Sequence, residues 1–412
     1  MRALSADIIV VGAGAAGILA AAFAAGGGRR VLLLERTRDG GRKILISGGG
    51  RCNILPSEVD PSWFVSDSSP HSLRNILRSW PLAAQRQFFD TEAGIPLVLE
   101  EETGKLFPAS QRARDVRDRL LAFAHGRGAT IRFEATTEDV RPDAGGWTVL
   151  LAGGEELRSS TVVLATGGLS VPSTGSDGAG LGIAARLGHR VCQTYPALTP
   201  LTTDAPRFTA LSGVSLEVSL TSPPVTPRYN RPQGFLFTHR GFSGPAVLNI
   251  SHVAVRSQLN GGPRQPIVAR WGPLDRAAWE AELGAGGTAA VRTVIRRHLP
   301  SRLADALADE AGVPSDRTLA QIRREERQEL LRALTAFTLP WTGDEGYRKA
   351  EVTGGGVALE EVHPGTLESR RCPGLFLCGE MLDAFGPIGG FNFLWAFATG
   401  RAAGLGARAR AA

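Results

Sequence analysis

Lysine is scarce in this chain of 412 residues, since only Lys43, Lys105 and Lys349 contribute to its 46 basic residues and all the others are arginine. The formal net charge of +6 could indicate a nucleic-acid or membrane-surface partner. However, so lopsided a choice of arginine equally fits a coding bias. The arginines are also interspersed with acids, as in residues 323–327 (Arg-Arg-Glu-Glu-Arg), which is typical of a solvated helix face. The pattern argues against nucleic acid as a partner.

Cysteine is also rare, and no stretch of the chain is long and apolar. Cys52, Cys192, Cys372 and Cys378 form no Cys-x-x-Cys pair, and the seven histidines are scattered, which excludes a disulfide framework and gives no metal site. No window reaches eighteen unbroken strongly apolar residues, and the beginning of the chain lacks a basic region followed by a cleavage site. We therefore expect a soluble cytoplasmic protein with no membrane partner. The sequence does not indicate its oligomeric state.

The length and composition are those of a globular protein of two or three domains. Hydrophobic residues make up 43% and charged residues 21% of the chain. The 51 glycines follow no repeat, so they indicate many tight turns rather than a low-complexity chain.

The first motif lies near the beginning of the chain. The apolar run 7–11 leads into Gly12-Ala13-Gly14-Ala15-Ala16-Gly17, an alanine-rich helical segment follows, and the apolar run 31–34 ends at Glu35. This order predicts a buried parallel strand, a glycine turn, a helix and a second strand, which is the pattern of a dinucleotide site. The N-terminus of the helix would face two phosphate charges.

Each conspicuous residue of this motif has a predicted role. Gly12 allows a sharp turn, Gly14 lets a pyrophosphate come close, and Gly17 lets the helix pack against the strand. Glu35 can accept hydrogen bonds from ribose hydroxyls and would repel a 2′-phosphate, which disfavours NADP. The alternative is a tight strand-to-helix turn that binds nothing.

A second glycine-rich stretch, residues 40–53, follows directly and contains Ser47-Gly48-Gly49-Gly50-Arg51-Cys52-Asn53. Three consecutive glycines let the backbone approach a planar or anionic ligand. We expect Lys43 and Arg51 to offset phosphate charge, and Ser47 and Asn53 to donate to ring carbonyls. A flexible surface loop is the alternative.

Two further stretches end apolar runs in small residues. Residues 161–168 read as a buried strand ending in Ala165-Thr166-Gly167, against which a flavin could lie, or as a simple core strand with a turn. Residues 374–380 read as a strand ending in Gly379-Glu380, with Asp383 close behind. Gly389-Gly390-Phe391-Asn392 then opens an alanine-rich helix, predicted from about residue 393 to 404. Its N-terminus suits a flavin, whose ring becomes negative near N1 and the C2 carbonyl on reduction.

Between these parts, from about residue 191 to 347, prolines and short alternating strands indicate a β-rich insert, and residues 274–337 look helical. His239, Arg240 and Tyr195 are candidate proton donors, because the insert should cover the flavin. A lone histidine is more often structural.

Together these motifs resemble the bacterial FAD-dependent flavoprotein family described as HI0933-like or aminoacetone oxidase-like NAD(P)/FAD-dependent oxidoreductases. One branch resembles reductases of bile acids and other enones. The resemblance implies an α/β fold: a Rossmann-like FAD-binding domain of the glutathione-reductase type, interrupted by a β-barrel-like insert with a small helical subdomain. We place the FAD-binding domain at 1–190 and 348–412, the insert at 191–272 and 338–347, and the helical subdomain at 273–337. The residues expected to contact FAD are Gly12, Gly14, Ala15, Ala16, Gly17, Glu35, Arg36, Gly41, Arg42, Lys43, Ser47, Gly48, Gly49, Gly50, Arg51, Cys52, Asn53, Ala165, Thr166, Gly167, Gly379, Glu380, Asp383, Gly389, Gly390, Phe391 and Asn392.

The leading functional hypothesis is an oxidoreductase that passes a hydride through FAD to or from a small organic substrate, with a conjugated enone as one candidate. No second glycine motif of the right spacing follows a strand, so NAD(P)H as a transient donor would have to dock over the flavin. Two alternatives stay open, a flavoprotein that modifies RNA and a flavin-binding redox protein that is not an enzyme.

Overall fold

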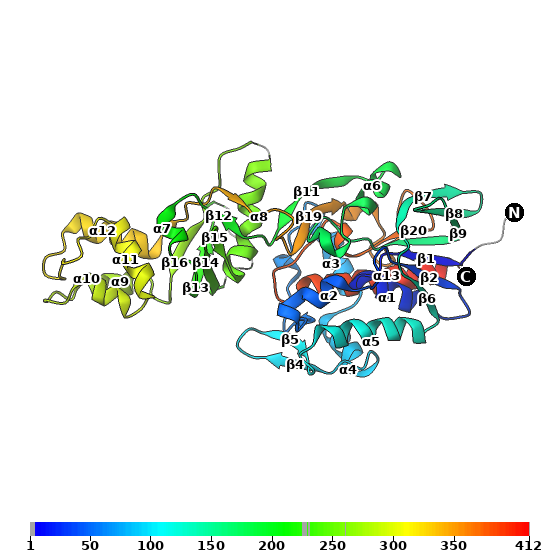
Figure 1. Cartoon of the computed structure of the whole chain (residues 1–412), viewed down its shortest axis with the longest axis horizontal. Helices are drawn as coiled ribbons and strands as arrows, with labels where there is room; N and C mark the ends of the chain where they lie inside the picture. The colour runs from blue at the N-terminus through cyan, green and yellow to red at the C-terminus, as the bar shows by residue number, and fades with distance from the viewer. Residues whose placement is uncertain (1–4, 225–228, 230, 260, 412) are drawn as a thin grey trace. The chain divides into compact units, whose positions relative to one another are not determined.

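The computed structural model describes residues 5–224, 229, 231–259 and 261–411, and the chain forms two compact units (Figure 1). The first unit contains the residues up to Thr194 together with those from Val352 onward, and the second contains Tyr195–Glu351. No helix in the described part of the chain combines the length and the apolar character needed to cross a membrane.

The first unit is built on a parallel sheet of five strands in the order β20-β10-β1-β2-β6. At its centre, Val10 lies opposite Val163 on one side and Leu33 on the other. Strands β1 and β10 are buried along their whole length, as expected for a parallel sheet that is covered on both faces. The strands are β1 (Ile8–Val11), β2 (Val31–Leu34), β6 (Ala129–Arg132), β10 (Thr161–Leu164) and β20 (Leu375–Leu377).

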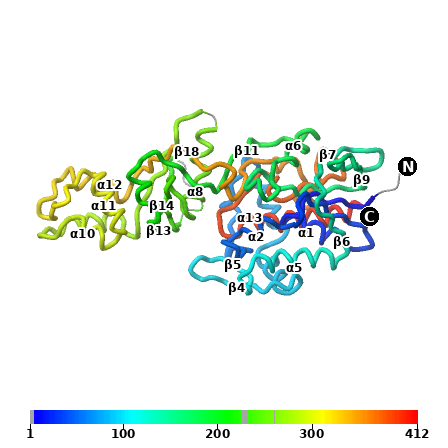
Figure 2. The backbone as a smooth tube through the Cα atoms, in the orientation of Figure 1, coloured from blue at the N-terminus to red at the C-terminus, as the bar shows by residue number. Residues whose placement is uncertain are grey.

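Two helices that are far apart in sequence, α1 (Ala15–Ala24) and α13 (Phe391–Arg410), lie side by side in this unit (Figure 2). A Cβ atom placed on Gly400 would lie 2.3 Å from the carbonyl oxygen of Ala16, and one on Gly404 would lie 2.4 Å from that of Ala20. The glycines therefore let the two backbones touch. Because both contacts advance in the same direction, the helices run parallel.

The remaining elements of the first unit surround the sheet. Two small antiparallel sheets have the orders β3-β5-β4 and β7-β8-β9, and β11 pairs with β19. The strands are β3 (Leu55–Pro56), β4 (Leu97–Glu100), β5 (Lys105–Pro108), β7 (Thr137–Asp143), β8 (Gly146–Leu151), β9 (Glu156–Ser159), β11 (Val191–Ala197, which continues into the second unit) and β19 (Val352–Val357). The helices are α2 (Arg42–Ile46), α3 (Pro70–Arg78), α4 (Leu82–Thr91), α5 (Ala113–Gly126) and α6 (Ala179–Arg186), with 3-10 turns η1 (Ser47–Gly50), η2 (Pro61–Trp63), η3 (Pro172–Thr174), η4 (Leu359–Glu361) and η5 (Gly379–Met381).

The second unit has an antiparallel sheet of seven strands in the order β17-β16-β13-β14-β15-β12-β18. Its strands are β12 (Leu201–Thr202), β13 (Ser215–Thr221), β14 (Gln233–Thr238), β15 (Gly241–Ser243), β16 (Val268–Trp271), β17 (Phe337–Thr338) and β18 (Gly343–Asp344). Its helices are α7 (Pro206–Thr209), α8 (Pro245–Leu259), α9 (Arg276–Gly284), α10 (Val291–Arg296), α11 (Ser301–Glu310) and α12 (Arg324–Thr335).

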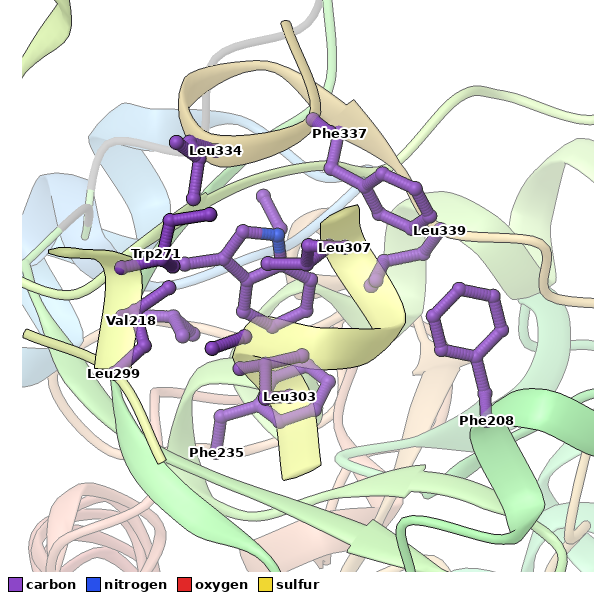
Figure 3. Close-up of a cluster of buried hydrophobic side chains, with 14 of the residues drawn as sticks. Phe208, Val218, Phe235, Trp271, Leu299, Leu303, Leu307, Leu334, Phe337 and Leu339 are labelled. Atoms are coloured by element: carbon purple, nitrogen blue, oxygen red, sulfur yellow. The ribbon is translucent and has the colours of Figure 1, made fainter. Parts of the chain in front are cut away.

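One cluster of buried apolar side chains joins this sheet to its helices (Figure 3). Trp271 from the sheet and Leu303 and Leu307 from α11 are fully buried in it. The β-rich segment and the helical segment, which we predicted as separate parts, thus share one core. The predicted domain boundaries near residues 190 and 348 lie within a few residues of the limits of the two units.

The α/β fold with a parallel central sheet is confirmed. The predicted hairpin of residues 97–108 forms as β4 and β5, and the predicted turn after Asp143 separates β7 from β8.

Candidate functional site

The turn between β1 and α1 is shaped by two tight backbone contacts. Gly12 has φ of +101°, and a Cβ there would lie 2.6 Å from the carbonyl oxygen of Ala165. A Cβ on Gly17 would lie 1.7 Å from the carbonyl oxygen of Gly12. By contrast, a Cβ on Gly14 would have no neighbour within 4 Å. The first and third glycines therefore fit the backbone together, and the second leaves open space.

The N-terminus of α1 faces this open space without a side-chain cap. No side chain accepts from its first N–H groups, and its first turn, which contains Ala15 and Ala16, has no acidic residue. The first N–H groups of a helix have no partner inside the helix, and they carry the positive end of its dipole. The turn is therefore suited to an anionic group such as a pyrophosphate.

Glu35 is held at the end of β2 by two backbone N–H groups and one hydroxyl. The backbone N–H of Ala13 donates to Glu35 Oε2 at 2.8 Å, and Oε1 accepts from the N–H and the hydroxyl of Thr37 at 2.9 and 2.7 Å. Its carboxylate is therefore fixed beside the glycine turn. The neighbouring Arg36 forms an ion pair with Asp177.

Short helix α2 carries the basic residues of the second motif. Gly41 precedes it in the left-handed conformation, and Arg42 Nε donates to Asp39 Oδ1 at 2.8 Å. Lys43 contacts two residues that are distant in sequence. Its Nζ lies 2.5 Å from both Glu380 Oε2 and Ser170 Oγ.

Glu380 is the centre of a polar network that joins four segments of the first unit. Besides Lys43, its carboxylate accepts from the Ser170 hydroxyl at 2.5 Å and from the N–H and hydroxyl of Thr353, both at 3.0 Å. Ser170 and Thr353 were not among the residues predicted from the sequence. The only signal was their position, since each lies beside a glycine-rich turn.

The loop of residues 47–53 exposes its glycine backbone, while Ser47 and Arg51 bond to neighbouring segments. Gly48, Gly49 and Gly50 all have positive φ, and a Cβ on either Gly49 or Gly50 would meet nothing within 4 Å. Ser47 Oγ donates to the Ile44 carbonyl at 2.8 Å, while Arg51 Nη1 lies 3.0 Å from Glu100 Oε1. The open part of this loop is therefore its main chain.

Cys52 is a packed residue in this loop. It is buried, and burial raises the pKa of its thiol to about 12, although a hydrogen bond with Ser47 acts in the opposite direction. The thiolate that would act as a nucleophile is therefore disfavoured.

The loop and the turn before α13 are joined by an amide. With its amide oriented to satisfy both neighbours, Asn53 donates to the Leu55 carbonyl at 3.1 Å and accepts from the N–H of Gly390 at 3.2 Å. Asn392 closes the turn by accepting from Gly386 N–H at 2.9 Å. Phe391, the first residue of α13, is buried.

The ends of β10 and β20 pack close to α1. The Ala165 carbonyl lies against Gly12, as described above. A Cβ on Gly180 would lie 1.9 Å from Thr166 Oγ1. A Cβ on Gly167 would lie 2.9 Å from Ser176 Oγ. A Cβ on Gly379 would lie 2.8 Å from the Cβ of Ala16. Small residues are required at these strand ends.

Asp383 has a different set of partners from Glu380. It is buried, and its Oδ2 accepts from Ser66 Oγ, Asp67 N–H and Ser68 Oγ at 3.1, 2.9 and 2.8 Å. Burial raises the pKa of this carboxyl. In the structure, Asp383 therefore fixes the segment of residues 66–68.

The three candidate proton donors lie in the second unit. His239 and Arg240 are exposed in the turn between β14 and β15, and Arg240 Nη1 lies 3.6 Å from Glu345 Oε2. Tyr195 is buried, with the guanidinium of Arg256 5.5 Å from its ring centre. A catalytic role for these residues stays a prediction.

Four contacts bring the predicted cofactor residues of the first unit together. They are Gly12 with Ala165, Ala16 with Gly379, Lys43 with Glu380, and Asn53 with Gly390. Because α1 and α13 run parallel, and Gly400 lies beside Ala16, the N-terminus of α13 extends eight residues, or about 12 Å, beyond that of α1. An extended ligand with an anionic group near each end would meet both helix ends.

Comparison with known proteins gives the family to which the chain belongs. The family model described as HI0933-like protein Rossmann domain matches residues 6–406. A ribosomal RNA dihydrouridine synthase of Escherichia coli (strain K12) is 35% identical over 397 residues, which cover 95% of this chain and 96% of the relative. A 3-dehydro-bile acid delta(4,6)-reductase of Clostridium scindens is 30% identical over 408 residues, covering 97% and 98% of the two chains.

Solved structures with the same fold include flavoenzymes of low sequence identity. The open conformation of a flavocytochrome c3 fumarate reductase has a TM-score of 0.52 and 16% identity, covering 100% of this chain and 79% of the other. A 3-ketosteroid-delta4-(5alpha)-dehydrogenase of Rhodococcus jostii RHA1 has a TM-score of 0.50 and 16% identity, covering 99% and 98%. The chain belongs to the HI0933-like family with a Rossmann-type domain, and it is a flavin-dependent oxidoreductase whose cofactor is FAD.

Proposed function

We propose that this protein reduces a carbon–carbon double bond that is conjugated to a carbonyl group, with FAD as the hydride carrier. The observation that carries the proposal is the group of glycine turns and helix N-termini in the first unit, at Gly12–Gly17, Gly48–Gly50 and Gly389–Gly390, which we call the backbone cradle. There, Gly14 at the N-terminus of α1 and Gly49 and Gly50 of the second glycine-rich stretch have no atom within 4 Å of where a Cβ would lie. When bound, FAD supplies a carrier of two electrons and one proton.

The names of the relatives point to one kind of reaction. Dihydrouridine differs from uridine by two hydrogens across a double bond conjugated to a ring carbonyl, and a delta(4,6)-reductase of a 3-dehydro acid acts on bonds conjugated to a ketone. In both reactions, a hydride adds to the carbon that is β to the carbonyl and a proton adds to the α carbon. An enone reductase, which is one of our sequence-based hypotheses, fits both substrates.

Within the cradle, the residues fall into groups by what they offer a dinucleotide. The N-terminus of α1 at Gly14 offers N–H groups to the pyrophosphate, and Glu35 offers a fixed carboxylate to a ribose. Glu380 would face the polyol chain, held in place by Lys43. The open backbone of Gly49 and Gly50 and the start of α13 would bound the ring.

The uracil ring of RNA is the candidate substrate to test first, and a small free enone is the second. Two ribosomal RNA dihydrouridine synthases are relatives, at 35% and 33% identity. The β-rich insert (residues 191–272 and 338–347) contains seven arginines against four acids, whereas residues 273–337 contain ten of each. The β-rich part of the second unit is thus distinctly basic, which suits a polyanionic substrate.

The test starts from the visible spectrum of the purified protein. We expect stoichiometric FAD, anaerobic bleaching by NADH or NADPH, and reoxidation of the reduced protein by its substrate. Ribosomal RNA and a steroid enone would be compared as oxidants, with dihydrouridine measured by mass spectrometry. Loss of the RNA reaction as salt is raised would support RNA as the substrate. Reoxidation by neither compound would contradict the proposed reaction.

A further inference from the structure

Strand β5 lies next to two glycine turns of the first unit, the one at Gly48 and the one at Gly389. Its residues 105 and 107 share one face, since side chains alternate along a strand. A Cβ on Gly48 would lie 3.3 Å from the ring of Phe107, and a Cβ on Gly389 would lie 3.6 Å from Cε of Lys105. The Lys105 side chain therefore reaches the turn that opens α13.

The charge of Lys105 is not used in an ion pair within the described part of the chain. The acid opposite it on β4 is Glu100. That carboxylate accepts from the Thr103 hydroxyl at 2.6 Å and from Arg51 at 3.0 Å. These two bonds are the largest causes of its lowered pKa, and the charge of Lys105 is a smaller one. Lys105 thus adds a positive charge beside Gly389 and the N-terminus of α13.

The type of residue also fits such a role. The chain uses lysine three times among 46 basic residues, and an ammonium differs from a guanidinium in being a compact charge on a flexible stem. Such a group can approach one atom of a ligand without the planar fork of arginine.

We propose that the positive charge of Lys105 stabilises the negative charge of reduced FAD. This inference rests on the proposed function, in which the ring end of FAD lies at the turn before α13. Uptake of two electrons and one proton leaves one net negative charge, shared by N1 and the C2 carbonyl of the ring. The Lys105 side chain lies beside Gly389, which precedes the N-cap of α13, and a positive charge and a helix N-terminus both favour that negative charge. Lys105 therefore raises the reduction potential of the bound cofactor.

The potential of bound FAD in the full-length holoprotein tests this inference. For Lys105→Gln, we expect the equilibrium for reduction to weaken about tenfold, which equals about 30 mV for a two-electron couple. The pH at which reduced FAD gains its N1 proton should rise, and this is visible in the absorption spectrum. Lys105→Arg keeps the positive charge and should change both quantities less than Lys105→Gln does. Lys349→Gln, which neutralises an exposed lysine of the second unit, is the matched control and should change neither quantity.

The outcomes separate this inference from the proposed function. A Lys105→Gln protein that holds FAD but keeps both wild-type values would overturn the inference alone. Loss of FAD from Lys105→Gln, with full binding by Lys105→Arg, would also overturn it, because the charge would then serve binding. If the wild-type protein itself held no FAD, the proposed function would fail first.

Discussion

The two units of this protein are held together in different ways. The first unit brings backbone against backbone through glycines and joins distant segments by polar groups such as the Lys43–Glu380 pair. The second unit is held by large apolar side chains around Trp271. The difference shows where each unit tolerates change. Each unit also contains the other kind of contact, since Phe88 and Phe89 are buried in the first and a Cβ on Gly241 of the second would lie 2.3 Å from the Leu201 carbonyl oxygen. The glycine contacts of the first unit, however, lie at its predicted cofactor turn.

The sharpest way to break this contrast is to add one methyl group to the first unit. In Gly17→Ala, the new Cβ would lie 1.7 Å from the Gly12 carbonyl oxygen. We expect a loss of more than about 4 kcal/mol in the free energy of unfolding, or failure to fold. Denaturant unfolding and FAD content would be measured. Gly14→Ala is the control, and it should fold normally but bind FAD more weakly, because its Cβ enters open space. Equal stability of the two variants would refute the packing argument.

The complementary experiment removes a side chain from the second unit. Trp271→Ala empties the centre of a fully buried cluster, so we expect a loss of about 3–5 kcal/mol. The affinity for FAD should remain, since the predicted cofactor residues lie in the first unit. Calorimetry and flavin absorbance measure the two effects. Leu236→Ala, at a side chain that is 37% exposed, should have little effect on either. Loss of FAD from folded Trp271→Ala would show that the contrast is too simple.

Asp383 tests how strongly polar groups stabilise the first unit. Asp383→Ala leaves the Asp67 N–H and the Ser68 hydroxyl without their acceptor, while the Ser66 hydroxyl keeps the backbone carbonyl of residue 383, so we expect a loss of about 2–4 kcal/mol in unfolding free energy. Thermal unfolding of the holoprotein would show it. A loss below about 0.5 kcal/mol would mean that water replaces the carboxylate.

The same residue gives a prediction for pH. Because burial raises the pKa of Asp383 in the folded protein above its ordinary value of 3.8, the folded state holds this proton more tightly than the unfolded chain does. The resulting stability is complete below pH 3.8 and is lost as the pH rises through the folded-state pKa. Asp383→Asn should remove this part of the pH dependence. Unchanged curves of stability against pH would contradict it.

The smallest expected effect concerns the network around Glu380. Glu380→Gln keeps the shape but removes the charge that Lys43 faces, and we expect FAD to bind about tenfold more weakly, or about 1.4 kcal/mol. Fluorescence titration of the apoprotein measures this. Glu155→Gln, which affects the exposed pair with Arg132, is the control and should leave the affinity for FAD unchanged.

The sequence predicted those parts of the fold that depend on neighbouring residues. The apolar runs of β1, β2, β10 and β20, and the hairpin of β4 and β5, were all readable from local patterns. The end of α13 was not. We predicted it near residue 404, where a glycine commonly ends a helix, but the helix continues to Arg410. Gly404 and Gly406 are there because neighbouring carbonyl groups lie within 3 Å of where a Cβ would be.

The candidate site shows the same limit. The glycine turns were predicted from their spacing, but the partners of the charged side chains were not. Lys43 meets Glu380 across 337 residues of sequence, and Arg51 meets Glu100 across 49. Such pairs depend on the folded chain, and neither spacing nor composition can reveal them.

The pairing of α1 with α13 has a consequence for synthesis on the ribosome. All of the second unit leaves the exit tunnel before the helix that covers α1 has been made. The alanine-rich helix α1 is therefore made long before α13, the helix that packs against it. Chaperones that shield nascent chains would be needed most by this half-finished unit.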